Sequence, residues 1–218
     1  MPTLIVLTLL PLAVIAVQLG SGATGWLGYT PYKFALLIPP LIYCRVMRIS
    51  VWHDVLKLQN WRRGLKRSIV LGVAAVAIFW GTYYALADRL LDKPVITQKI
   101  SEQFHVTAEN VFWVAPLTIF LNSLLEEFFY RGFAFGQLVR RNVRIGYLLP
   151  AAAFTVQHLA FTYHWAGWGA IVMGIVALSV FALVLQKIYA VTDTLVAPWV
   201  IHMFGDVAMM GIAVTLLR

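Results

Sequence analysis

The sequence predicts an all-α, polytopic membrane protein built as a bundle of about seven transmembrane helices. Of its 218 residues, 61% are hydrophobic and only 12% are charged, whereas soluble domains are about 45–50% apolar and about 25% charged. The mean hydropathy is +0.81. The hydrophobic residues also gather in blocks, and most of these blocks approach the ~20 residues that a helix needs to cross a bilayer.

Seven apolar segments are predicted to form the spans. The second segment is broken by Pro39 and Pro40, which predicts a kink or partial insertion. We find no internal repeat and no low-complexity tract, so we expect a single membrane domain over residues 1–218. The segments are 3–19, 34–47, 68–87, 111–139, 145–163, 167–187 and 194–217.

The loops between the segments differ in charge, and this difference predicts the orientation of the chain. Residues 45–67 carry seven Lys or Arg against one Asp, and residues 140–144 are also basic. Residues 88–110 are mixed and slightly acidic. By the positive-inside rule, the two basic loops and the N-terminus are cytoplasmic and the 88–110 loop is outside. We expect an integral protein of a prokaryotic inner membrane.

The net charge of +8 is explained by these basic loops, which fix topology and contact anionic lipid, so no nucleic-acid partner is expected. Between Val51 and Leu65, apolar residues are interspersed with basic ones, which predicts a short amphipathic helix on the cytoplasmic face. A solvated basic loop is the alternative. The one cysteine, Cys44, excludes an internal disulfide and a multi-cysteine metal site.

Away from the ends of the predicted spans, six acidic, basic or histidine residues lie at depths where a charge costs at least about 2.5–3.5 kcal/mol. These residues belong to three separate helices. At ~1.5 Å per residue, they lie roughly 13–21 Å from the predicted cytoplasmic ends of those helices. We therefore expect them to converge on one buried polar site. They are Glu126, Glu127, Arg131, His158, His202 and Asp206. The other histidines, His53, His105 and His164, fall in loops or at segment ends and are expected to be solvated.

The spacing within the fourth segment separates two roles. Glu127 and Arg131 are four residues apart on a helix, in the favourable order for an ion pair, and are expected to form a structural salt bridge. Glu126 points about 100° away and is free to face a cavity.

The other two helices present imidazoles. His158 shares a helix face with Phe154, and His202 shares one with Asp206. A carboxylate and an imidazole aimed at one water form a general base. A second His with an Asp could hold a metal or stabilise an oxyanion, and Asp206 could also simply orient His202.

Three motifs resemble those of the CPBP family, the CAAX-protease and bacteriocin-processing (Abi) intramembrane proteases. The segment from Glu126 to Arg131 resembles its EExxxR motif, and the segment from Phe154 to His158 resembles FxxxH. The segment from His202 to Asp206 resembles Hxxx(N/D). The motifs occur in the family's order, which places a motif-bearing catalytic core at about 111–217.

The resemblance implies an endopeptidase that cleaves a peptide bond within or beside the membrane, as in CAAX-type, leader-peptide or C-terminal tail processing. Glu126 would activate the attacking water with His158. His202 and Asp206 would stabilise the oxyanion, or His202 would join a metal site. Asp206 stands where eukaryotic CAAX endopeptidases usually have Asn, so orientation of His202 or metal binding gains weight for this residue.

Family members are described both as metalloproteases and as glutamate-type proteases, and the sequence leaves this choice open. No cofactor is firmly implied, but a divalent metal such as zinc would have four candidate ligands. Glu127, Arg131 and Phe154 would provide structural support. The candidate ligands are Glu126, His158, His202 and Asp206.

Two alternative functions compete with a protease. The first is a catalytically silent immunity or scaffold protein of the same family, which the complete motif set disfavours. The second is a small transporter, which would also bury acids and histidines, but its expected inverted repeats are not found. The expected partners are membrane lipid and a peptide or protein substrate with a membrane-proximal cleavage site.

Overall fold

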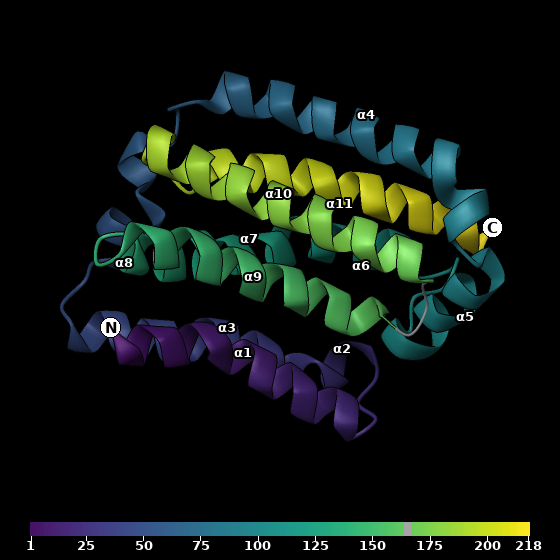
Figure 1. Ribbon diagram of the computed structural model, residues 1–218, viewed down its shortest axis with the longest axis horizontal. Helices are drawn as coiled ribbons and strands as arrows, with labels where there is room; N and C mark the ends of the chain where they lie inside the picture. The colour runs from purple at the N-terminus through teal and green to yellow at the C-terminus, as the bar shows by residue number, and fades with distance from the viewer. Residues whose placement is uncertain (164–166) are drawn as a thin grey trace.

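The computed structural model describes residues 1–163 and 167–218, which form a bundle of long helices (Figure 1). Each of the seven predicted segments corresponds to a helix or to a continuous helical rod. The prediction of an all-α polytopic bundle is therefore confirmed. The long elements are α1 (Pro2–Gly20), α3 (Thr30–Val46), α4 (Leu65–Leu90), the rod Val111–Leu138, α9 (Val143–Thr162), α10 (Trp168–Thr192) and α11 (Val196–Leu217).

The helices are stacked across the molecule, as Figure 1 shows. The pair α1 and α3 forms one side, α9 and the rod lie in the middle, α10 and α11 come next, and α4 forms the opposite side. Contacts between α1 and α9, α9 and α10, and α4 and α11 join the layers. Within the rod, every residue from 126 to 138 is buried. The charged part of the rod is therefore enclosed by other helices and does not face lipid.

Five elements are long and apolar enough to cross a membrane: α1, α4, the rod, α10 and α11. A sixth span results if α3 is counted together with residues Val51–Asn60, which bend away from it by 114°. This is fewer than the predicted number of about seven, and the remaining helix is α9. Its 20 residues are long enough to span a bilayer, but Arg144, Gln157 and His158 reduce its mean hydropathy.

The amphipathic helix predicted between Val51 and Leu65 is not continuous, which corrects that prediction. The segment forms two short turns, η1 (Val51–Leu56) and η2 (Leu58–Asn60), separated by Lys57 with φ 52°. The cause is tertiary packing that a sequence pattern does not show. The side chain of Val55 is fully buried, and its carbonyl oxygen accepts a 2.8 Å hydrogen bond from the Tyr189 hydroxyl on α10.

The same segment keeps the surface character that the sequence predicted. Trp52 and Trp61 are exposed among basic side chains, as is typical of a protein surface at the membrane–water interface. Lys57 forms an ion pair with Asp193 at the junction of α10 and α11. The segment is thus attached to the helices that carry the polar residues.

The rod changes its helical geometry around the two glutamates. It consists of α6 (Val111–Pro116), the π-helical η3 (Leu117–Asn122), α7 (Ser123–Glu127), the π-helical η4 (Phe128–Phe135) and α8 (Gly136–Leu138). The regular pattern is weakened where η3 begins, because Pro116 has no N–H to donate. Wide π-helical turns within α-helices are frequent at functional sites. Here they flank the turn that carries Glu126 and Glu127.

The two ends of the bundle separate the loops by charge. The N-terminus, the basic segment 45–67 and the basic turn 140–144 lie at one end (Figure 1). The short helices α2 (Gly25–Gly28) and α5 (Lys93–Phe104) and the C-terminus lie at the other end (Figure 1). This arrangement is the one that the loop charges predict. Which end faces the cytoplasm remains a prediction.

Candidate active site

Glu126 lies on α7 in the centre of the bundle, and only 2% of its surface is exposed. Its two carboxylate oxygens have different environments. Oε1 accepts hydrogen bonds of 2.9 Å from Asn122 Nδ2 and of 2.9 Å from Gln157 Nε2. Oε2 is buried and has no hydrogen-bond partner in the described structure. A buried anionic oxygen without a partner is costly, which indicates that Oε2 is reserved for a bound group.

His158 approaches that oxygen from α9. Its Nδ1 lies 2.9 Å from the carbonyl oxygen of Phe154 and must carry a hydrogen to donate to it. In the neutral ring, Nε2 is then the nitrogen with a lone pair, and it lies 3.6 Å from Glu126 Oε2. The side chain of His158 is 30% exposed, so this side of the site is the more open one.

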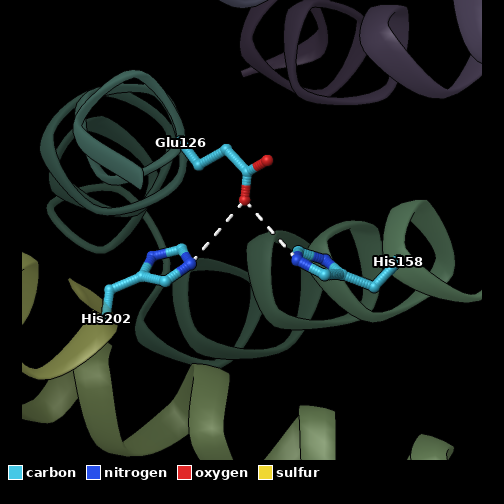
Figure 2. A group of neighbouring side chains, drawn as sticks. All are labelled: Glu126, His158 and His202. Atoms are coloured by element: carbon cyan, nitrogen blue, oxygen red, sulfur yellow. Dashed lines mark ion pairs between the residues drawn. The ribbon is translucent and has the colours of Figure 1, made fainter. Parts of the chain in front are cut away.

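His202 approaches from α11 in a similar way. Its Nδ1 donates to Glu127 Oε1 over 2.8 Å, which leaves Nε2 at 3.9 Å from Glu126 Oε2. Figure 2 shows the resulting arrangement, in which one carboxylate oxygen faces two imidazole rings from separate helices. The sequence predicted that Glu126, His158 and His202 converge, and the structure brings them together.

The three facing atoms are close enough to bind one small group. One ligand atom from each of Glu126, His158 and His202 lies within 4.8 Å of the others. The separations of 3.6 and 3.9 Å are too long for direct hydrogen bonds. A cation between the three atoms would satisfy all of them, whereas a water would donate its two hydrogens to two of the three.

The donor set also fits a divalent metal. Two histidines and one glutamate are ligands that zinc uses in hydrolases, at about 2.0–2.2 Å. Tetrahedral geometry then places ligand atoms about 3.3–3.5 Å apart. The two imidazole Nε2 atoms lie at nearly these distances from Glu126 Oε2, at 3.6 and 3.9 Å. Both Nδ1 atoms already donate to oxygen, as metal-bound histidines usually do. The residues therefore fit such an ion, and they also fit a water that donates to two of the three atoms.

Glu127 and Arg131 form the predicted ion pair, with Arg131 Nη1 2.9 Å from Glu127 Oε1, and both side chains are fully buried. The guanidinium carbon lies 4.3 Å from the centre of the Phe154 ring. That ring in turn contacts the rings of His158 and His202. Glu127, Arg131 and Phe154, which were expected to provide structural support, thus pack next to the two imidazole rings.

One role of Glu127 was not predicted: it also holds His202. Asp206 was a predicted candidate for orienting His202, but in the structure the close contact comes from Glu127. Asp206 Oδ1 lies 3.8 Å from His202 Nε2, beyond hydrogen-bond distance. Asp206 also lies outside the group of three that could hold a metal. The sequence spacing showed that Asp206 shares a face with His202, but not that Glu127 reaches across from another helix.

Three further polar residues of the site were missed by sequence reasoning. Asn122 and Gln157 donate to Glu126, and Lys33 on α3 donates to Asn122 Oδ1. Lys33 stands one residue before the second predicted segment, so it was not counted as intramembrane. Asn122 could have been found by its position four residues before Glu126, on the same helix face.

Among the described residues, the two other histidines take no part in this site. His53 and His105 are exposed, as the sequence predicted. His164 lies outside the described residues.

The fold and the site together define a class: a helical membrane protein with a hydrolase-like cluster of one carboxylate and two imidazoles inside the bundle. A comparison with protein families gives a match to part of the chain. Residues 108–208 match the family described as type II CAAX prenyl endopeptidase Rce1-like. This range contains all three motifs, so the resemblance to the CPBP proteases is confirmed.

The matched family is a protease family, which supports a peptide or protein as substrate in a membrane setting. Neither the curated proteins nor the solved structures contain a match to the chain.

Proposed function

We propose that the protein is an intramembrane endopeptidase in which Glu126, assisted by two histidines, activates a water for attack on a peptide bond. The observation that carries this proposal is the convergence on one free oxygen: His158 Nε2 and His202 Nε2 lie 3.6 and 3.9 Å from Glu126 Oε2. The family match supports peptide-bond hydrolysis as the reaction.

In the proposed reaction, Glu126 Oε2 accepts a proton from a water held between the carboxylate and the imidazoles. The resulting hydroxide attacks the carbonyl carbon of the substrate and forms a tetrahedral oxyanion. As the C–N bond breaks, Glu126 returns the proton to the leaving amine. An imidazolium carries a proton on both nitrogens and can donate from Nε2 to the oxyanion. Glu127 is placed to stabilise the positive charge of the His202 imidazolium.

The same three side chains would be the ligands if the enzyme uses a divalent metal, and Asp206 would lie just outside them. A bound metal would supply Lewis-acid polarisation of the water and the carbonyl. In either case, Glu127 and the Phe154 carbonyl orient the two rings, and the enclosing helices limit the access of bulk water.

Asp206 has a different proposed role from that of a ring-orienting residue. Its side chain is 18% exposed and lies on the same face of α11 as His202. It therefore stands at the edge of the site, where the substrate would contact it and where its protonated form would donate to the oxyanion.

A cleavage assay in proteoliposomes tests the proposed function. Wild type, Glu126→Gln, His158→Ala and the control His53→Ala would be compared on peptides that carry a membrane-anchored tail. The two site variants are expected to lose at least about 100-fold in turnover, the low end of acid–base catalysis. His53→Ala should retain the wild-type rate because His53 is exposed and distant.

The same assay, repeated with a chelator, separates the two catalytic types. Activity that survives chelation supports a glutamate-type protease. Activity that is lost and then restored by Zn²⁺ supports a metal held by Glu126, His158 and His202. If the wild type cleaves no peptide in a panel of leader, prenylated and C-terminal tail sequences, the protease proposal fails and the silent-protein alternative gains support.

A further inference from the structure

Glu126 Oε1 is held by two side-chain amides, and a second residue fixes the orientation of each amide. The first is Asn122. Lys33 Nζ donates to Asn122 Oδ1, and because an ammonium can only donate, the amide oxygen must face it. The amide nitrogen therefore faces the other way, and it donates to Glu126 Oε1 over 2.9 Å.

The second amide belongs to Gln157, and Tyr130 fixes it. The hydroxyl of Tyr130, which is fully buried, donates to Gln157 Oε1. Gln157 Nε2 then points at Glu126 Oε1 over 2.9 Å. The reversed amide would place its oxygen against a carboxylate oxygen, so the observed orientation is the one that satisfies both contacts.

The two chains of hydrogen bonds end on the same atom. A carboxylate oxygen offers about two acceptor positions, and both positions of Oε1 are filled by Asn122 and Gln157. The remaining oxygen, Oε2, is the one that faces the two imidazoles. The four supporting residues come from α3, η3, η4 and α9, so the assembled bundle selects which oxygen is free.

The charge of Lys33 adds a second reason for this arrangement. Glu127 already has Arg131 as its counter-charge. Within the described ranges, Lys33 makes no ion pair of 4 Å or less, and its electrostatic partners are Glu126 and Asp206. A buried carboxylate needs a nearby positive charge to stay ionised in a membrane, and Lys33 is placed to provide it for Glu126.

We propose that Lys33 and Tyr130 are positioning residues that, through Asn122 and Gln157, fix Glu126 as an ionised base with one oxygen free for the attacking water. The structural part of this proposal concerns the ionised carboxylate alone. Its catalytic part rests on the proposed function. Two experiments therefore test the parts separately.

The first experiment is a double-mutant cycle on thermal stability and needs no activity. Lys33→Met is combined with Glu126→Gln, and the melting temperature of all four proteins is measured in the same detergent. In the wild-type background, Lys33→Met is expected to lower the melting temperature by at least about 3 °C. In the Glu126→Gln background, the same change should lower the melting temperature by clearly less, because the half-buried ammonium has then already lost Glu126, the first of its two electrostatic partners.

The control is Lys187→Met, which makes the same substitution at an exposed position on α10. It should shift the melting temperature equally in both backgrounds. Equal effects of Lys33→Met in the two backgrounds would overturn the proposal, since the charge of Lys33 would then be independent of Glu126.

The second experiment separates kcat from KM. Lys33→Met and Gln157→Leu are expected to lower kcat at least about 10-fold and to change KM by less than about threefold. Lys33→Arg should recover most of the lost kcat, because it keeps the charge and the donor. Gln186→Leu serves as the control, since the Gln186 amide is buried against the backbone of Tyr147 and Ala151, away from Glu126.

The outcomes distinguish the two proposals. A raised KM with unchanged kcat would overturn the positioning role and would indicate that Lys33 contacts the substrate. If the stability cycle shows coupling but the wild type cleaves no peptide, the link between Lys33 and Glu126 is supported and the protease function is contradicted. If the stability effects of the two substitutions are additive and the wild type cleaves peptides, the positioning role is contradicted and the protease function is supported.

Discussion

Glu127 shows how one buried residue can serve both stability and chemistry. Its Oε1 contacts Arg131 Nη1 at 2.9 Å and His202 Nδ1 at 2.8 Å. The arginine compensates the charge of the carboxylate, and the carboxylate fixes which nitrogen of His202 faces the site. An aspartate in a serine-protease triad orients its histidine by the same kind of contact.

This arrangement predicts a strong effect of removing the arginine. Arg131→Met should destabilise the protein by about 3–5 kcal/mol, because Glu127 loses the positive charge that compensates it and keeps only its hydrogen bond to His202. The double variant Glu127→Gln with Arg131→Met should recover much of that loss, since neither charge remains. Unfolding in a denaturing detergent series would measure both changes. An Arg131→Met variant as stable as the wild type would contradict a structural role for the pair.

At the residue scale, the sequence predicted which side chains come together better than it predicted how they pair. Glu126, His158 and His202 could be recognised because ionisable groups inside apolar spans are rare and these share a depth. The contact of Glu127 with His202 could not, because it depends on the rotation of two helices about their axes. Lys33 was missed because nothing in the local pattern shows that the start of α3 faces the site.

At the scale of elements, α9 is held in place by a close approach of backbones. A Cβ atom on Gly146 would lie 2.5 Å from Val139 Cα and 2.6 Å from Val139 N. A backbone cannot move aside as a flexible side chain can, so the glycine is required for α9 to pack against the end of the rod. The same helix carries Gln157 and His158 further along.

Gly146→Ala should therefore displace α9, with a loss of about 1–3 kcal/mol in stability, typical of overpacking, and a lower rate of peptide cleavage. Gly81→Ala is the matched control, because nothing lies within 4 Å of its Cβ position on the exposed face of α4. That change should be neutral or stabilising by up to about 1 kcal/mol. Equal melting temperatures for the two variants would show that the close contact at Gly146 is unimportant.

The prediction of elements succeeded where hydropathy decides the structure and failed where packing does. Long apolar blocks predicted the helices because backbone groups in lipid must be satisfied within the helix. Residues 51–65 have an amphipathic composition, but the segment forms two short turns instead of one helix. Its Val55 side chain is buried, and the Val55 carbonyl oxygen accepts a hydrogen bond from the Tyr189 hydroxyl. Five or six elements meet the length and hydropathy of a span, against about seven predicted, because Arg144, Gln157 and His158 lower the mean hydropathy of the 20-residue α9.

At the scale of the whole molecule, the candidate site exists only when the bundle is assembled. Glu126, His158 and His202 come from the rod, α9 and α11, and the residues that support them add α3 (Figure 2). The family match over residues 108–208 includes the three motifs but leaves out α1, α3 and α4. Helix α3, which lies outside the matched range, places Lys33 against Asn122, the neighbour of Glu126.

The proposed mechanism requires that these three side chains act on one reacting group. A comparison of turnover in single and double variants tests this requirement. Rates of peptide cleavage would be measured for Glu126→Gln, His202→Ala and the double variant in proteoliposomes. Residues that act as a unit give a double variant about as slow as the slower single variant. A double variant whose loss equals the product of the two single losses would show that Glu126 and His202 act independently and would contradict the account.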